Sequence, residues 1–202
     1  MKNYKLLIPV LLLYCSSLFA QTDTSLVLLT SLDSTIITDV KYATENNFTK
    51  KVLYPSAKVY LRADAAKQLV KANEFLKKTF NLRIKVFDGY RPLAVQKLMW
   101  AILPDENYVA DPAKGSRHNR GCAVDLTLID ETGMELDMGT PYDDFTEKAR
   151  PDYPGIEERA KANRKILNLA MVQFGFKQME TEWWHFDFHG WENYSILDIQ
   201  IK

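Results

Sequence analysis

Residues 122–129 read Cys122-Ala123-Val124-Asp125-Leu126-Thr127-Leu128-Ile129. The segment is rich in β-branched and aliphatic side chains, which predicts a largely buried strand. One acid, Asp125, interrupts the apolar run and is its unusual feature. A carboxylate at such a position is either a paired polar group of the core or part of a functional site.

The sequence on both sides of this strand predicts further helices and strands. Three segments have the apolar spacing of helices with one buried face, namely 62–80, about three turns from Pro92, and 156–174 with Gly175 as its C-cap. Two segments alternate as half-buried strands do, namely 82–86, which ends in a turn at Asp88-Gly89, and 184–188. Because hairpin-like turns join some of these elements, we expect one α+β domain over 22–202, with helices packed against a central antiparallel sheet.

The first 20 residues have the pattern of a signal peptide. Lys2 and Lys5 precede an apolar run over 6–13, and small residues end at Ala20, near which we expect cleavage. The run is too short to span a bilayer. A lipid anchor on Cys15 is disfavoured because a bulky tyrosine precedes that cysteine. We therefore expect an exported, periplasmic protein without stable membrane insertion.

The composition is that of an ordinary globular protein. The chain has 202 residues, of which 47% are apolar, and its 26 lysines and arginines balance its 26 aspartates and glutamates. No basic excess indicates a nucleic-acid partner. Two cysteines, Cys15 and Cys122, are too few for a disulfide scaffold.

Two histidines and Asp125 form a candidate metal site. His118 lies seven residues before Asp125, and His185 lies in the aromatic segment near the C-terminus. Imidazoles and a carboxylate suit Zn²⁺, and three protein ligands leave a fourth position for water, as catalytic zinc sites do. The sequence thus predicts a single catalytic zinc ion.

The spacing of these residues predicts local geometry. Positions 118 and 125 differ by an odd number, so in one unbroken strand their side chains would point to opposite faces. We therefore expect His118 to precede the strand, with Gly121 giving the backbone the freedom to return. Glu182 lies three residues before His185, so in a regular strand it would point away from the metal. We therefore expect a turn or bulge at 182–184.

Two further residues complete a hydrolytic site. Glu182 can accept a proton from zinc-bound water and pass it to a leaving amine. Arg91 lies at a strand-to-helix junction, where its guanidinium can stabilise an oxyanion. Each of these residues taken singly also has a structural interpretation. Asp125 could be a paired polar group of the core, His118 a loop residue and Arg91 a salt-bridge partner. The combination of all these residues favours hydrolysis.

The motifs resemble those of the VanX-type zinc D-alanyl-D-alanine dipeptidases, within the wider group of D,D-peptidases. They occur in the order of that family over nearly the whole chain after residue 20, namely Lys41-Tyr42-Ala43-Thr44, Asp88-Gly89-Tyr90-Arg91-Pro92, Ser116-Arg117-His118 through Asp125, Tyr142-Asp143 and Glu182-Trp183-Trp184-His185. The resemblance implies the fold of the D-Ala-D-Ala peptidases and hedgehog-like domains. It also implies zinc-dependent hydrolysis of D-Ala-D-Ala into two D-alanines.

The resemblance further implies a role for each matching residue. His118, Asp125 and His185 would hold zinc, while Glu182 would be the general base and Arg91 would polarise the scissile carbonyl. Three more residues would bind the substrate, with Tyr42 and Asp143 receiving its ammonium group and Ser116 its carboxylate. Asp143 is preferred to the adjacent Asp144 because it directly follows Tyr142.

Two other functions remain open on sequence grounds. A D,D- or L,D-carboxypeptidase acting on longer peptidoglycan peptides would use the same zinc ligands with a more open pocket, which the segment between Asp130 and Asp152 would decide. A non-catalytic binding module stabilised by zinc would need no acid at position 182, so Glu182 argues against it. An exported dipeptidase would recycle dipeptides released from the cell wall.

Overall fold

The predicted core strand is β5 (Ala123–Ile129), and all seven of its residues are buried. The computed structural model describes residues 25–202, and the predicted signal peptide lies outside them. β5 is the middle strand of a five-stranded sheet with the order β2-β4-β5-β7-β6. It pairs antiparallel with both of its neighbours, which encloses it on both edges.

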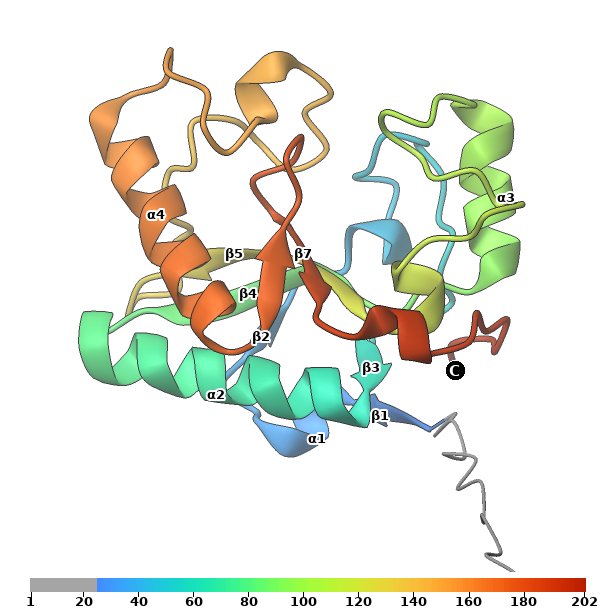
Figure 1. The fold of residues 1–202 in the computed structure, drawn as a ribbon, viewed down its shortest axis with the longest axis horizontal. Coiled ribbons are helices and arrows are strands. Elements are labelled where there is room, and N and C mark those ends of the chain that lie inside the picture. The colour runs from blue at the N-terminus through green and yellow to red at the C-terminus, as the bar shows by residue number, and fades with distance from the viewer. Residues whose placement is uncertain (1–24) are drawn as a thin grey trace, which may run out of the picture.

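The other elements surround β5 as Figure 1 shows. The remaining strands are β1 (Leu26–Leu28), β2 (Ile37–Thr38), β3 (Tyr60–Arg62), β4 (Arg83–Asp88), β6 (Phe176–Gln178) and β7 (His185–Phe188). The α-helices are α1 (Leu29–Leu32), α2 (Ala63–Phe80), α3 (Leu93–Ile102) and α4 (Glu158–Gln173). Short 3₁₀ helices lie at Lys41–Ala43, His118–Arg120, Glu147–Ala149 and Trp191–Asn193. β1 and β3 form a separate two-stranded sheet.

The α+β prediction is confirmed, but the expected antiparallel sheet is wrong in one strand pair. β2 runs parallel to β4, with Ile37 opposite Lys85 and Thr38 opposite Val86. Parallel neighbours need a long crossover connection, and the chain supplies one through β3 and α2. The main sheet is therefore mixed.

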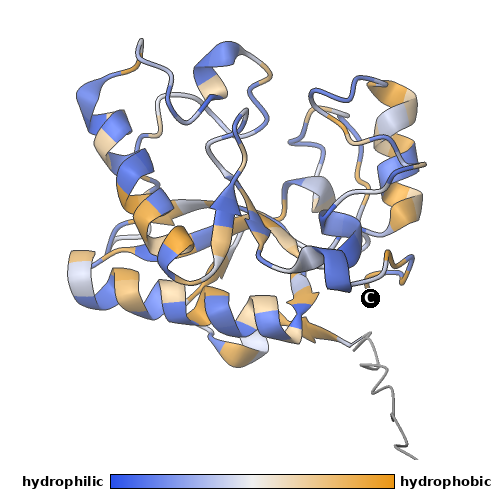
Figure 2. Cartoon of the chain, viewed as in Figure 1, coloured by the Kyte–Doolittle hydropathy of each residue, from blue (hydrophilic) through white to orange (hydrophobic). Residues whose placement is uncertain are grey.

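The helices lie close to the predicted ranges. α2 ends at Phe80, and its C-cap Asn81 has a left-handed φ of 57°. α4 ends at Gln173 with Phe174, rather than the predicted Gly175, as its C-cap, and Gly175 follows with a left-handed φ of 83°. Pro92 was expected to be the first helical residue, but it caps α3 from outside, and the helix begins at Leu93. Figure 2 shows hydrophobic and hydrophilic residues mixed along α2 and α4, as expected for helices that bury one face. Within the part of the chain that is described, no helix is long and apolar enough to cross a membrane.

A buried arginine fixes the loop between β5 and α4. Arg164 of α4 is 2% exposed, and its guanidinium donates to the carbonyl oxygens of Met138 at 2.7 Å, Arg150 at 2.6 Å and Lys148 at 3.0 Å. One side chain thereby ties both ends of the loop over 138–150 to the helix. The loop therefore has a fixed position over the sheet.

We expect Arg164→Met to lower the free energy of unfolding by about 3 kcal/mol, because it leaves buried carbonyl groups without donors. Urea unfolding followed by circular dichroism measures this. The control is Lys165→Met on the exposed side of the same helix, which should change stability little. Equal stability of the two variants would contradict this account of the loop.

Candidate active site

Three neighbouring strands place three polar residues in one row. Asp125 of β5 lies opposite His185 of β7 on one side and Asp88 of β4 on the other. Side chains directly opposite each other on adjacent strands share a face of the sheet. A bulge in β4 shifts the register after Val86, and without it Phe87 would lie opposite Asp125. The predicted strand at 184–188 is confirmed as β7, which brings His185 to Asp125 from the adjacent strand.

His118 reaches the row from a 3₁₀ turn before β5. Gly121 ends that turn with a φ of 70°, a left-handed conformation that suits glycine. Asn119 fixes the turn, since its amide donates to the Arg91 carbonyl at 2.9 Å and its Oδ1 accepts from the Ser116 amide at 2.8 Å. The predicted position of His118 ahead of the strand is confirmed.

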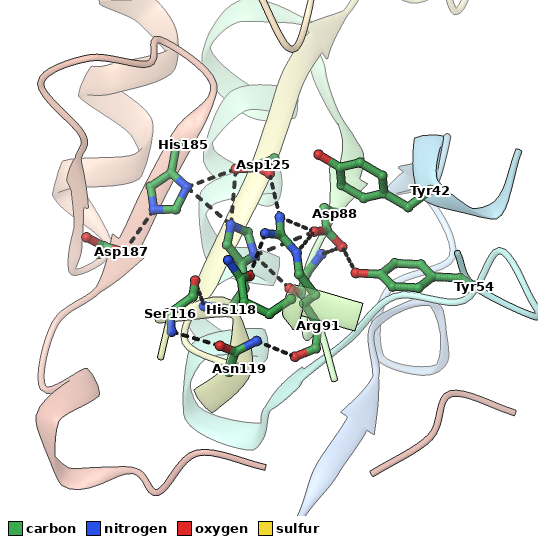
Figure 3. Close-up of polar contacts among 12 residues, drawn as sticks. Tyr42, Tyr54, Asp88, Arg91, Ser116, His118, Asn119, Asp125, His185 and Asp187 are labelled. Atoms are coloured by element: carbon green, nitrogen blue, oxygen red, sulfur yellow. Dashed lines mark hydrogen bonds and ion pairs between the residues drawn. The ribbon is translucent and has the colours of Figure 1, made fainter. Parts of the chain in front are cut away.

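The three candidate ligand atoms face one another, as Figure 3 shows. Nδ1 of His185 lies 3.0 Å from Oδ1 of Asp125 and 3.2 Å from Nε2 of His118, and the latter lies 3.4 Å from Oδ1 of Asp125. All three residues are buried. The trio is therefore a compact donor set enclosed by protein.

Hydrogen bonds on the far side of each imidazole orient the ring. Nδ1 of His118 lies 2.7 Å from the carbonyl oxygen of Gly89, and Nε2 of His185 lies 2.9 Å from Oδ1 of Asp187. When these nitrogens donate, the other nitrogen of each ring presents a lone pair to Asp125. Two lone pairs and a carboxylate at this separation repel one another unless a cation lies among them.

The electrostatics of the trio also favour a cation. Burial alone would raise the pKa of Asp125, but the adjacent His118 and His185 lower it. Burial alone would lower the pKa of His185, but hydrogen bonds with Asp125 and Asp187 raise it. The site thus stabilises positive charge between these residues. Two imidazoles and a carboxylate are a donor set that fits Zn²⁺.

Glu182 lies beside the trio because the chain turns before β7. The turn occupies residues 183 and 184, which confirms the predicted break. Oε2 of Glu182 is 3.8 Å from Nδ1 of His185. Burial raises the pKa of Glu182 to about 7. A carboxylate with a pKa near neutrality can both accept and return a proton.

Arg91 is held rigidly next to Asp125. Its Nε and Nη2 donate to Oδ2 of Asp88 at 3.0 and 2.7 Å, and its Nη1 donates to Gln96 at 3.0 Å. Nη2 lies 4.0 Å from Oδ2 of Asp125. Arg91 is therefore both a salt-bridge partner and a fixed cation at the site. Three of its five N–H donors are used in these bonds, which leaves two for another group.

Asp143 and two tyrosines close the other side of the site. The Tyr42 hydroxyl lies 3.2 Å from Oδ2 of Asp143, and the Tyr142 hydroxyl donates to Oδ2 of Asp125 at 3.0 Å. Asp143 has a left-handed φ of 58°, which is uncommon outside glycine. Burial, together with the charge of Asp125, raises the pKa of Asp143 to about 8. The neighbouring Asp144 instead accepts from the Thr146 amide at 2.8 Å.

All eight residues singled out in the sequence line one cavity of about 120 Å³, namely Tyr42, Arg91, Ser116, His118, Asp125, Asp143, Glu182 and His185. Sequence reasoning assigned no role to Asp88, Tyr142 or Asp187, which orient Arg91, Asp125 and His185. Asp187 carried a signal, because it shares a strand face with His185 two residues away. Asp88 carried none, because its position depends on the bulge.

Comparisons with known proteins show the family of this chain. Residues 22–198 match the family model described as D-Ala-D-Ala dipeptidase. The chain is 37% identical over 164 residues to the D-alanyl-D-alanine dipeptidase of Escherichia coli strain K12, covering 81% of this chain and 84% of that protein. It is 34% identical over 187 residues to the D-alanyl-D-alanine dipeptidase of Enterococcus faecium, covering 81% of this chain and 92% of the relative. The chain therefore belongs to the D-Ala-D-Ala dipeptidase family and is a peptidase.

Proposed function

We propose that this protein hydrolyses the free dipeptide D-Ala-D-Ala to two D-alanines, with one Zn²⁺ held by His118, Asp125 and His185. The observation that carries the proposal is the presence of the Asp143 carboxylate in the same small cavity as the three ligands. A carboxylate there can pair with the free ammonium group of a dipeptide. The named activity of the relatives supports the choice of substrate.

Glu182 and Arg91 are the two side chains of the protein that take part in the reaction. When bound, Zn²⁺ supplies a Lewis acid that polarises the scissile carbonyl and lowers the pKa of water. Glu182 accepts the proton of the attacking water and delivers it to the nitrogen of the leaving D-alanine. Arg91 directs its free N–H groups at the carbonyl oxygen as negative charge develops there. Asp88 and Gln96 keep the guanidinium in place during this step.

The cavity favours a dipeptide over a longer chain. Asp143 and Tyr42 bind the ammonium group at one end, and Ser116 donates its hydroxyl to the substrate carboxylate at the other. The Ser116 hydroxyl oxygen accepts from the His118 amide at 3.1 Å, so its proton is free to be donated. A peptide with a blocked or extended amino end would leave the Asp143 carboxylate inside the cavity without a cation, which is costly. Carboxypeptidase activity on longer peptides is therefore disfavoured.

The N-terminal segment indicates the compartment in which this activity takes place. Its signal-peptide pattern supports export to the periplasm, with cleavage near Ala20. There the enzyme would act on dipeptides released from peptidoglycan, rather than on the precursor pool of the cytoplasm. Recycling of D-alanine is the role that fits this location.

The direct test is hydrolysis of three substrates by the zinc-loaded protein, namely D-Ala-D-Ala, N-acetyl-D-Ala-D-Ala and a wall peptide that ends in D-Ala-D-Ala. We expect cleavage of the free dipeptide alone, and we expect a chelator to abolish it until Zn²⁺ is restored. Release of D-alanine is the measurement. Cleavage of the blocked or longer peptides would make the protein a carboxypeptidase, and no cleavage with metal bound would favour a binding module.

The general base is tested with Glu182→Gln, which keeps the size of the side chain but cannot accept the proton. We expect kcat to fall by about 10²- to 10⁴-fold while zinc stays bound. Steady-state kinetics and metal analysis of the same sample measure both quantities. His118→Ala is the contrasting variant and should lose zinc as well as activity. A fully active Glu182→Gln protein would refute the assigned role.

The adjacent acids 143 and 144 provide a matched pair for the ammonium site. Asp143→Asn should reduce kcat/KM for D-Ala-D-Ala by about 10- to 100-fold, because a neutral amide forms a weaker bond to the ammonium group. Asp144→Asn should change it little, since that side chain faces Thr146. The kcat/KM ratio of free to N-acetylated dipeptide reports the effect. The assignment fails if the two variants behave alike.

A further inference from the structure

Arg117 is a cation at the active-site cavity that has no part in the proposed mechanism. It lies between Ser116 and His118 in the chain, directly before the 3₁₀ turn at His118–Arg120, and lines the same cavity as both neighbours. Its side chain is 42% exposed. The guanidinium is therefore accessible to a ligand that enters the cavity.

The guanidinium of Arg117 is fixed in place but has donors to spare. Its Cζ lies over the Trp191 ring, 4.8 Å from the ring centre. Its Nε is buried and has no hydrogen-bond partner among residues 25–202. The closest carboxylate oxygen, Oδ2 of Asp187, is 3.7 Å from Nε, which is beyond hydrogen-bond distance. Nε thus has no acceptor in the described chain, and the exposed part of the guanidinium is the part that an incoming anion can reach.

Arg91, the other arginine that lines the cavity, is held by partners of its own. Arg91 forms two hydrogen bonds with Asp88 and a third with Gln96. Oδ1 of Asp187 lies 2.9 Å from Nε2 of His185, so this carboxylate is shared between Arg117 and the histidine. Arg117 is thus the cavity-lining arginine whose charge lacks a close hydrogen-bonded carboxylate within the described chain.

The arrangement of charge matches a zwitterion. Figure 3 shows Tyr42, which contacts Asp143, on one side of the metal-ligand trio and Ser116 and Asp187 on the other. Arg117 adjoins Ser116 in the chain and approaches Asp187. Asp143 and Arg117 both line the cavity, so it offers a carboxyl group and a guanidinium to one ligand. A free dipeptide carries the two complementary groups, an ammonium group and a carboxylate.

We propose that Arg117 binds the terminal carboxylate of the substrate together with Ser116, and that it sets the requirement for a free carboxylate. This inference rests on the proposed dipeptidase function. A guanidinium can present two parallel N–H groups to the two oxygens of a carboxylate. The Ser116 hydroxyl supplies a further donor from the adjacent residue. An uncharged amide at the same position would forfeit the charge-assisted part of this binding.

The test compares D-Ala-D-Ala with D-Ala-D-alaninamide in the wild-type protein and in Arg117→Met, both loaded with zinc. The wild type should prefer the acid, and Arg117→Met should reduce the acid-to-amide ratio of kcat/KM by about 10- to 100-fold. The reduction should come from the acid alone, with the zinc content unchanged. Arg117→Lys should restore part of the ratio, because it keeps the charge but not the paired donors.

Arg120 provides the matched control. It belongs to the same turn and stacks on the same ring, with its Cζ 5.3 Å from the centre of Trp191, but it does not line the cavity. Arg120→Met removes an equal charge and should leave the acid-to-amide ratio unchanged.

Two results would overturn the assignment of Arg117. One is an equal loss for acid and amide in Arg117→Met, which would indicate an effect through Asp187 and His185. The other is a wild-type protein that cleaves both substrates equally well. If the wild type cleaves neither, the proposed function fails instead. Calorimetric binding of D-alanine and D-alaninamide to wild type and Arg117→Met then tests the carboxylate site alone, and equal affinities of the wild type for both would refute it.

Discussion

The structure depends on the close approach of three ligand atoms inside a buried site. Asp125, His118 and His185 bring an oxygen and two nitrogens to within 3.0–3.4 Å of one another. When both imidazoles are neutral and turn their lone pairs inward, such a set is repulsive, so the fold must hold it together. It does so with the backbone, because Asp125 and His185 are opposite residues of two paired strands. Histidine ring orientation is fixed in turn by Gly89 and Asp187.

A second group of interactions fixes the loops and turns that lie outside the main sheet. Asp88 accepts hydrogen bonds from Arg91 and from the Tyr54 hydroxyl, at 2.8 Å in the latter case. Arg62 donates from Nε to the Arg120 carbonyl at 2.8 Å and so ties β3 to the turn that carries His118. Arg164 does the same for the loop that carries Asp143. Loops that supply functional side chains are thus fixed by buried charged groups that bond to backbone carbonyls.

These constraints produce a cavity with charge at defined places. The three candidate ligands line it together with Glu182, Asp143 and Arg117. Because the cavity is only about 120 Å³, a substrate has to place its own charges against these groups. On the proposed function, a short zwitterion fits both the size and the charges of the cavity, whereas a mismatched peptide leaves a carboxylate or guanidinium of the cavity without a partner.

The sequence by itself determined the α+β class, the main helices and strands, and the identity of the residues that line the site. It succeeded because apolar periodicity is local and because parity alone requires His118 to precede β5 and a turn to precede His185. It did not determine the parallel pairing of β2 with β4, or the roles of Asp88 and Asp187. Those features depend on a crossover and a bulge, and on which residues meet across strands. The preference for Asp143 over Asp144 rested only on its position after Tyr142, and only the tertiary structure shows that Asp143, at a left-handed backbone position, lines the cavity while Asp144 does not.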